Sequence, residues 1–220
     1  MLAAAWDALA GATGIGDGTA LLDLGCGDGA FCAFAARRGA IVHGLDVEPD
    51  AIAEALVAVP GADLRLGLME DLPWSDASFD VVCSFNALQY ALDPEMALIE
   101  ASRVTRPGGR IAICKWGPPL ENEFFSFLRA IGAGGVRGGE LPATDPVESA
   151  IRATAMDVLV TGDVPAPIEM PGEAALEASL ARAHIDVDAS VTEAAGPYRR
   201  GDGSYRFEAR LRFWILGGRR

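Results

Sequence analysis

Three glycines at alternate positions and the aspartate before them carry the clearest chemical signal in this chain. An apolar segment, Ala20 to Leu24, runs directly into Gly25, Gly27 and Gly29, and an alanine-rich amphipathic segment follows to about Arg38. The first segment predicts a strand and the second predicts a helix. Because a backbone without Cβ atoms can approach a ligand closely, this strand, turn and helix predict a cradle for an adenosine-containing ligand.

The aspartate at the end of the predicted strand favours one ligand class over another. Gly25, Gly27 and Ala30 formally satisfy the glycine spacing of dinucleotide-binding turns, with alanine in the third place. We expect Asp23 to be buried near the ligand, where its charge would repel a pyrophosphate and attract an ammonium and a sulfonium. A cationic ligand is therefore favoured, and a nicotinamide dinucleotide stays as the weaker alternative.

The run Asp23-Leu-Gly25-Cys-Gly27-Asp-Gly29 resembles the first motif of the class I S-adenosylmethionine-dependent methyltransferases, and the resemblance extends over about residues 19 to 116. It implies S-adenosyl-L-methionine as the cofactor. It also implies that the cofactor is bound by the strand end and turn, at Asp23, Gly25, Cys26, Gly27 and Gly29.

Further motifs of that family recur in order. Asp46 ends the next predicted strand, and the resemblance implies that it accepts hydrogen bonds from both ribose hydroxyls, with Val47 beside the adenine. After the third predicted strand, Met69 and Glu70 would hold the adenine, while Leu68 stands where the family usually has aspartate.

The segment after the fourth predicted strand begins with Phe85 and Asn86 and matches the family's segment beneath the methionine moiety. The (Asn or Asp)-Pro-Pro-aromatic tetrad of many methylases that act on exocyclic nitrogens is absent. A nucleic-acid base or a glutamine side chain is thereby disfavoured as the methyl acceptor.

Strands and helices alternate over the first two thirds of the sequence. Strands are predicted at 20–24, 41–45, 64–67, 79–84 and 110–116, and helices at 30–38, 50–59, from Pro94 to before Pro107, and at 120–131. In the last third, the segments 185–191 and 205–215 alternate apolar and polar residues and predict an antiparallel pair of strands. The expected fold is α/β: a doubly wound, Rossmann-like sheet of seven strands, mostly parallel with an antiparallel C-terminal hairpin.

Length and composition indicate one domain. A chain of 220 residues, half of them hydrophobic, can bury one substantial core, so residues 1–220 are predicted to form a single methyltransferase domain. The irregular, glycine- and proline-rich stretch 117–172 leaves the fifth predicted strand at its carboxyl end, where ligands bind in such sheets. We expect this insertion to act as a lid that covers the substrate.

Charge and cysteine usage exclude several partners and sites. A net charge of −13 argues against binding to nucleic acid, although the last 22 residues carry seven arginines against two acids. The first ten residues contain no basic residue and no long apolar run, so neither a signal peptide nor a membrane span is expected. The four cysteines have no metal-ligand spacing, so no metal site is predicted and reduced thiols in the cytoplasm are expected.

The predicted reaction is transfer of a methyl group from the sulfonium to an oxygen, nitrogen or carbon atom of a small molecule. The aromatic residues Trp116, Phe124, Phe125 and Phe127 suit an apolar or aromatic acceptor. No catalytic residue is predicted: His43 is expected in the core, and His184 lies outside the residues described below. Two alternatives stay open, namely the same fold and cofactor used for cyclisation or rearrangement, and a non-catalytic cofactor-binding module. The sequence is compatible with many small-molecule acceptors and with either a monomer or a homodimer.

Overall fold

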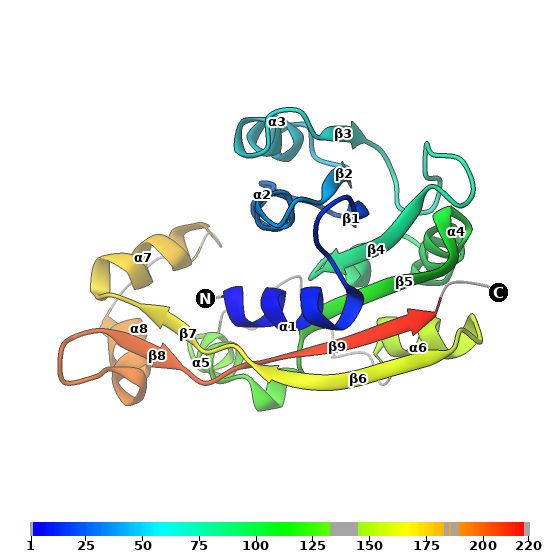
Figure 1. The fold of residues 1–220 in the computed structure, drawn as a ribbon. Helices are drawn as coiled ribbons and strands as arrows, with labels where there is room; N and C mark the ends of the chain where they lie inside the picture. Colours follow the sequence, from blue (N-terminus) through cyan, green and yellow to red (C-terminus); the bar gives the residue numbers. More distant parts are fainter. Residues whose placement is uncertain (1, 133–144, 183–184, 186–188, 218–220) are drawn as a thin grey trace. The chain divides into compact units, whose positions relative to one another are not determined.

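The strand before the glycine turn lies near the middle of a seven-stranded sheet in the computed structural model of the chain (Figure 1). The structure describes residues 2–132, 145–182, 185 and 189–217. The strand order is β3-β2-β1-β4-β5-β9-β6. Their bounds are Ala20–Leu24 (β1), Ile41–Asp46 (β2), Asp63–Leu66 (β3), Phe79–Phe85 (β4), Thr105–Trp116 (β5), Val158–Pro165 (β6) and Arg210–Gly217 (β9).

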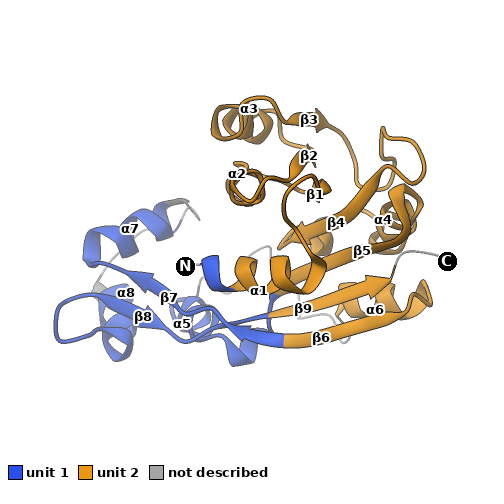
Figure 2. Ribbon diagram, in the orientation of Figure 1, with its two compact units in different colours: residues 1–4, 116–141, 163–211 blue, residues 5–115, 142–162, 212–220 orange. Residues whose placement is uncertain are grey.

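The described residues fall into two compact units, drawn in different colours in Figure 2. The sheet unit contains residues 5–115, 145–162 and 212–217, and the second unit contains residues 2–4, 116–132, 163–182, 185 and 189–211. The expected insertion 117–172 is thus divided: its residues 145–162 group with the sheet, and its remaining described residues group with the second unit.

The first five strands of the sheet are parallel. β1 pairs with β2 on one side and with β4 on the other, which places Asp23 opposite Gly44 and Cys83. The chain therefore builds outward from β1 in one direction and from β4 in the other. This reversal forms a topological switch point, where a ligand crevice is expected at the carboxyl ends of β1 and β4.

Short helices connect these strands, and several begin at a proline. In the sheet unit they are α2 (Ala30–Arg37), α3 (Pro49–Ala58), α4 (Pro94–Val104) and α6 (Pro146–Ala153), with the 3₁₀ turn η1 (Leu88–Tyr90), and α1 (Ala3–Thr13) enters this unit from the N-terminus. Asp93 and Asp145 accept backbone N–H bonds at the N-termini of α4 and α6. α2 packs on α3, and α4 packs on α6. The crossover that contains α2 and the one that contains α4 run in opposite directions across the sheet, so right-handed connections place the two pairs on opposite faces. None of the helices in the described ranges is long and apolar enough to span a bilayer.

The far end of the sheet is antiparallel. The N–H of Gly217 donates to the carbonyl of Asp157 over 2.9 Å, and Thr161 Oγ1 donates to the carbonyl of Phe213 over 3.0 Å. Residue numbers rise along β6 as they fall along β9, so these two strands run in opposite directions. The predicted seven-stranded, mostly parallel α/β fold is confirmed.

The second unit has its own apolar core. Its elements are η2 (Pro119–Glu121), α5 (Glu123–Ala130), β7 (Ile168–Met170), α7 (Glu173–Arg182), α8 (Ala189–Ala195), η3 (Gly196–Tyr198) and β8 (Tyr205–Phe207), with β7 and β8 antiparallel. Phe127 is 1% exposed, and its ring lies 5.4 Å from the ring of Phe207, which is fully buried. Packing among rings of this size supplies much of the apolar area that stabilises a small unit.

Two elements of the last third differ from the prediction. Residues 189–195 form helix α8, so the predicted strand is wrong at residues 189–191, while residues 186–188 lie outside the described residues. Val191 and Ala195 are both buried and stand four residues apart, which is helical spacing. The predicted strand over 205–215 is interrupted between β8 and β9, and β9 lies between β5 and β6 in the sheet.

Candidate functional site

A cavity of about 520 Å³ opens at the carboxyl ends of the parallel strands, where the switch point predicts a ligand crevice. It is lined by residues that follow or end β1, β2, β3 and β4, together with the turn after β4. The lining residues are Gly25, Leu45, Asp46, Val47, Glu48, Gly67, Leu68, Met69, Glu70, Phe85, Asn86, Ala87, Tyr90, Ala91 and Leu92.

The glycine turn is shaped by close contacts at two of its positions. A Cβ on Gly25 would lie 2.2 Å from the Cβ of Ala87 and 2.9 Å from Met69 Cε, so no larger residue fits without movement. A Cβ on Gly29 would lie 2.8 Å from the Cα of Ala55 in α3. Gly25 thus permits the close approach of the segment after β4, and Gly29 permits close packing of α2 on α3.

Asp46 ties the glycine turn to the end of β2. Its Oδ2 accepts the N–H of Gly27 over 2.8 Å, and its Oδ1 accepts the N–H of Glu48 over 3.1 Å. A carboxylate has about four acceptor sites, so two remain for a ligand in the cavity. The side chain is held in one orientation while it can still accept two hydroxyl groups.

Charge in the cavity has one sign. Its ionisable lining residues are Asp46, Glu48, Glu70 and Tyr90, and among the described residues that line it there is no lysine, arginine or histidine. A phosphate-bearing ligand would meet carboxylates without a compensating cation, whereas a cationic ligand would be attracted. The electrostatics therefore favour the sulfonium nucleoside over the dinucleotide.

Comparison with known proteins agrees with this geometry. Residues 22–113 match the family model described as a methyltransferase domain. An uncharacterised methyltransferase of Synechocystis sp. is 39% identical over 101 residues, which are 45% of this chain and 48% of the relative. The malonyl-[acyl-carrier protein] O-methyltransferase of Erwinia billingiae is 38% identical over 94 residues, 43% of this chain and 38% of the relative. A crystal structure of a candidate methyltransferase from Bacillus halodurans superposes with a TM-score of 0.69 at 14% identity, over 99% of this chain and 100% of the other.

Over residues 22–113, fewer than half of its 220 residues, the chain is similar to methyltransferase domains. The chain spans about half the length, or less, of the curated relatives it matches. The matched residues run from within β1 to within β5, so the likeness includes the carboxyl ends of β1 to β4, which form the cavity. The structural match extends over the whole chain and shows the shared fold.

Asp23 lies behind the cavity and does not line it. Its carboxyl group is 2% exposed, and Cys32 Sγ and Cys83 Sγ lie 3.4 and 3.6 Å from its two oxygens. Burial raises the pKa of Asp23 from 3.8 to about 7, against the weaker lowering effect of the two thiols, and the charge of Asp46 raises it further. Asp46, rather than Asp23, is therefore the carboxylate that lines the cavity.

The predicted cofactor residues divide into two groups. Seven line the cavity: Gly25, Asp46, Val47, Met69, Glu70, Phe85 and Asn86. Four do not: Asp23, Cys26, Gly27 and Gly29. Of these four, Cys26 is buried and donates its backbone N–H to the carbonyl of Leu45, and Gly27 acts on the cavity through its bond to Asp46.

The turn after β4 closes one side of the cavity. Asn86 adopts a positive φ of 51°, and its N–H donates to the carbonyl of Cys114 over 2.7 Å. The ring of Phe85 packs 4.4 Å from that of Phe31 and 6.4 Å from that of Trp6, centroid to centroid. An aromatic cluster thus fixes the strand end that carries the two predicted residues.

The opposite side of the cavity is apolar and open. Val47, Leu68 and Leu92 are 51%, 45% and 82% exposed, so their side chains form an apolar rim. Glu70 does not extend freely into the cavity, because its Oε1 accepts the N–H of Asp93 over 2.9 Å. Sequence reasoning assigned no cofactor contact to Leu68, Tyr90 or Leu92, although their place directly after β3 and β4 was a usable signal.

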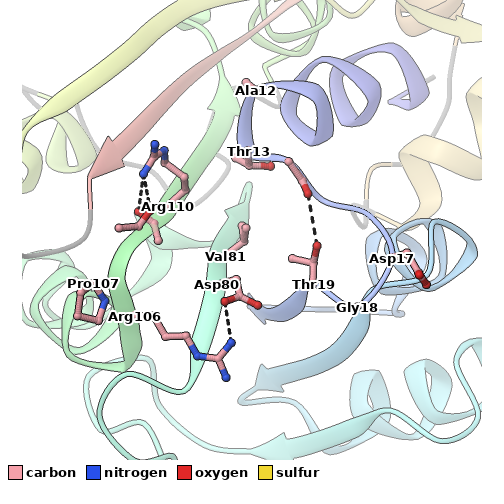
Figure 3. A pocket seen from close by; sticks show the side chains of 13 residues that line it. Ala12, Thr13, Asp17, Gly18, Thr19, Asp80, Val81, Arg106, Pro107 and Arg110 are labelled. Carbon is pink, nitrogen blue, oxygen red and sulfur yellow. Dashed lines mark hydrogen bonds and ion pairs between the residues drawn. The ribbon is translucent and has the colours of Figure 1, made fainter.

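A second cavity, of about 660 Å³, lies at the other ends of β1 and β4 (Figure 3). It contains both signs of charge, and its Arg106 is paired with Asp80 over 2.6 Å. Parallel sheets bind ligands at the carboxyl ends of their strands, and this cavity is at the amino ends. The smaller cavity, which joins four family motifs, is therefore the candidate site.

The other residues singled out for chemistry serve the fold. His43 packs edge-on against the ring of Phe79 at 5.0 Å, in agreement with the predicted core position. Of the aromatic set expected to suit an acceptor, Phe127 is buried in the second unit's core, and Trp116, Phe124 and Phe125 pack against that core. Within the described ranges, no three His, Cys, Asp or Glu side chains are grouped as a metal site.

Proposed function

We propose that the chain binds S-adenosyl-L-methionine in the cavity at the carboxyl ends of β1 to β4 and methylates a small molecule. The observation that carries this proposal is the cavity's charge: carboxylates without a basic side chain, with Asp46 oriented by the N–H groups of Gly27 and Glu48. When bound, the cofactor would supply an activated methyl group: a nucleophilic atom of the acceptor would bond to the methyl carbon in line with the carbon–sulfur bond, which breaks and leaves S-adenosylhomocysteine.

The residues of the chain would bind the cofactor and orient it. The two free acceptor sites of Asp46 suit the ribose hydroxyls, and Val47, Leu68 and Met69 offer apolar surface for the adenine. Backbone carbonyl groups near Phe85 and Asn86 would accept hydrogen bonds from the cofactor's ammonium group. Alignment of two reactants in this way supplies about 7–11 kcal/mol without a catalytic base. A base is needed only where the acceptor must lose a proton.

Binding is tested by titration calorimetry with S-adenosylmethionine, S-adenosylhomocysteine and NADH. We expect heat of binding from the first two and none from NADH. Asp46→Ala should weaken cofactor binding by about 2–4 kcal/mol, since it removes charge-assisted hydrogen bonds. Asp76→Ala is the matched control, because Asp76 is 79% exposed and does not line the cavity. Equal affinities in the two variants would remove Asp46 from the site.

Turnover is tested with methyl-labelled cofactor and a panel of apolar and aromatic acceptors. Label in the product supports methyl transfer. An acceptor that is converted without taking up label would favour cyclisation or rearrangement over methyl transfer. Tight cofactor binding without turnover of any acceptor would favour a non-catalytic binding module.

The acceptor's location is a separate part of the proposal. The stretch 117–172 is proposed to cover the acceptor, since it follows the carboxyl end of β5. Hydrogen exchange in residues 117–132 and 163–172 should slow when acceptor is added to the complex with S-adenosylhomocysteine. Unchanged exchange there would contradict a covering role.

A further inference from the structure

We propose that β6 pairs through its free edge with β6 of a second copy of the chain, in antiparallel orientation, so that two sheets join across a twofold axis. β6 is the last strand in the sheet order, and β9 is its one neighbour there. The inference concerns residues 157–162 of the sheet unit and is independent of the proposed function.

Among the described residues, no strand pairs with the outer edge of β6, which is long and is uncharged over residues 158–162. β6 has eight residues, and from Val158 to Gly162 none is charged. Val158, Leu159 and Val160 are 47%, 47% and 45% exposed, so side chains on both faces of the strand are half-uncovered. Proteins that stay monomeric commonly blunt such an edge with charges, with proline or with a very short strand.

The other edge of the same sheet shows such blunting. β3 has four residues, and Asp63 and Arg65 form an ion pair of 2.7 Å on it. Arg65 also donates to the carbonyl of Pro73, and Trp74 Nε1 donates to Asp63 over 3.3 Å. In β6 a charge and a proline, Asp163 and Pro165, stand only in the last three residues, so the contrast within one sheet indicates that the edge over residues 158–162 is kept open for a partner.

The chemistry of the edge specifies that partner. The outer backbone N–H and C=O groups of an edge strand can accept an extended strand, and the uncharged segment offers nothing to an acidic or basic ligand. Two copies carry a net charge of −13 each, so their repulsion disfavours contact, and it does so least at an uncharged segment. An antiparallel pair of identical strands is closed by twofold symmetry and leaves only the two β3 edges of the joined sheet.

Symmetry also fixes the register. A twofold axis perpendicular to the sheet keeps each side chain on its own face, so opposed residues must differ by an even number. Centring on Leu159 places Val158 opposite Val160 and Asp157 opposite Thr161 of the second copy. Centring on Val160 would instead oppose Asp157 to Asp163, and like charges directly opposite are destabilising. The register centred on Leu159 is therefore the expected one.

Cross-linking tests this register. Directly opposed Cβ atoms are about 4.5–5.5 Å apart, within reach of a disulfide, so Leu159→Cys should give an oxidised dimer on a non-reducing gel. Val160→Cys is the matched control. In this register the two introduced cysteines are two residues apart along the paired strands, so they should not form a disulfide. The four native cysteines are buried, so the wild-type chain should give no band. Cross-linking through Val160→Cys but not through Leu159→Cys would overturn the register.

Sedimentation tests the pairing itself. The wild-type chain should show a reversible, concentration-dependent dimer, and Leu159→Lys should weaken it at least about tenfold by placing two cations opposite each other. Val57→Lys adds the same charge at an 81% exposed position on α3 and should leave the dimer unchanged. A wild-type chain that stays monomeric, aggregates of unbounded size, or a dimer unaffected by Leu159→Lys would each overturn the proposal. An unchanged far-ultraviolet circular dichroism spectrum and a cooperative thermal transition of Leu159→Lys show that the variant is folded.

Discussion

The two units of the molecule use their buried side chains differently. In the sheet unit, an apolar cluster supports strands whose carboxyl ends surround a cavity, and Asp46 faces that cavity. In the second unit, the conspicuous aromatic residues Phe127, Tyr198 and Phe207 contact one another in the core. An aromatic cluster in a sequence is therefore weak evidence for an acceptor site, because a small unit needs the same residues for stability.

Truncation of one large core residue in each unit should separate their stabilities. Phe207→Ala removes a fully buried ring from the second unit, and Phe79→Ala removes a 1% exposed ring from the sheet unit. Each should cost about 3–5 kcal/mol, since the transfer and cavity contributions add. By hydrogen exchange, Phe207→Ala should increase exchange chiefly in β8 and α5, and cofactor affinity should be kept. Equal loss of protection in β1 and β4 would show that the two cores unfold as one.

Asp23 makes the sheet unit sensitive to pH. Its pKa rises from 3.8 to about 7 on folding because the group is buried. Between about pH 4 and 7 the unfolded chain has lost this proton while the folded chain keeps it, so the free energy of unfolding falls as the pH rises. The full shift corresponds to about 4 kcal/mol, and the loss levels off above pH 7.

Urea unfolding from pH 5 to 8 measures this effect. Asp23→Asn stays uncharged, so its stability should fall less over this range than that of the wild-type chain. Asp63→Asn is the control, because Arg65 lowers the pKa of Asp63 and any stability from that pair is lost only at more acidic pH. Parallel curves for the wild-type chain and Asp23→Asn would show that Asp23 is ionised in the folded protein at pH 5.

The sequence was sufficient for the parts of the fold whose signals are local. β1, the glycine turn and Asp46 follow from short runs of residues, and the structure has β1 within the predicted bounds. Helix α8 was not predicted from the sequence, because an alternation of apolar and polar residues over only seven positions also fits a helix with Val191 and Ala195 on one face. Residues such as Ala189 and Glu193 favour a helix once a core is available to cover that face.

Predictability of the site has the same limit. The positions of Asp46 and Val47 after β2 could be predicted from the order of strands alone. The approach of Ala87 to Gly25 and the contact of the Cys83 thiol with Asp23 depend on β1 and β4 being neighbours, although about 60 residues separate them. Only the pairing of these strands shows that Asp23 is enclosed between them.

A glycine substitution measures how close that approach is. Gly25→Ala meets Ala87 Cβ at 2.2 Å, whereas Gly14→Ala, at a similar positive φ of 77°, meets nothing within 4 Å. Both variants have the cost of a left-handed backbone, about 1–2 kcal/mol, and Gly25→Ala should cost about 1–3 kcal/mol more from overpacking. Denaturant unfolding and cofactor titration should both separate the two variants. If they are equally stable, the segment after β4 can move away from the glycine turn.

Two helix N-caps, one in each unit, give the smallest and most specific comparison. Asp93 accepts the N–H groups of Glu95 and Met96 at α4, and Asn122 Oδ1 accepts those of Phe124 and Phe125 at α5.

Replacement of either cap by alanine should cost about 0.5–2 kcal/mol. Asn122 is 1% exposed, and in the described part of the chain its buried Nδ2 has no hydrogen-bond partner, so Asn122→Ala also removes an unsatisfied donor. We therefore expect Asn122→Ala to lie at the lower end of that range and Asp93→Ala, which also removes a charge at a helix N-terminus, at the upper end. A larger loss from Asn122→Ala in denaturant unfolding would mean that Nδ2 is satisfied in solution, and that the interior of the second unit is more polar than its aromatic core indicates.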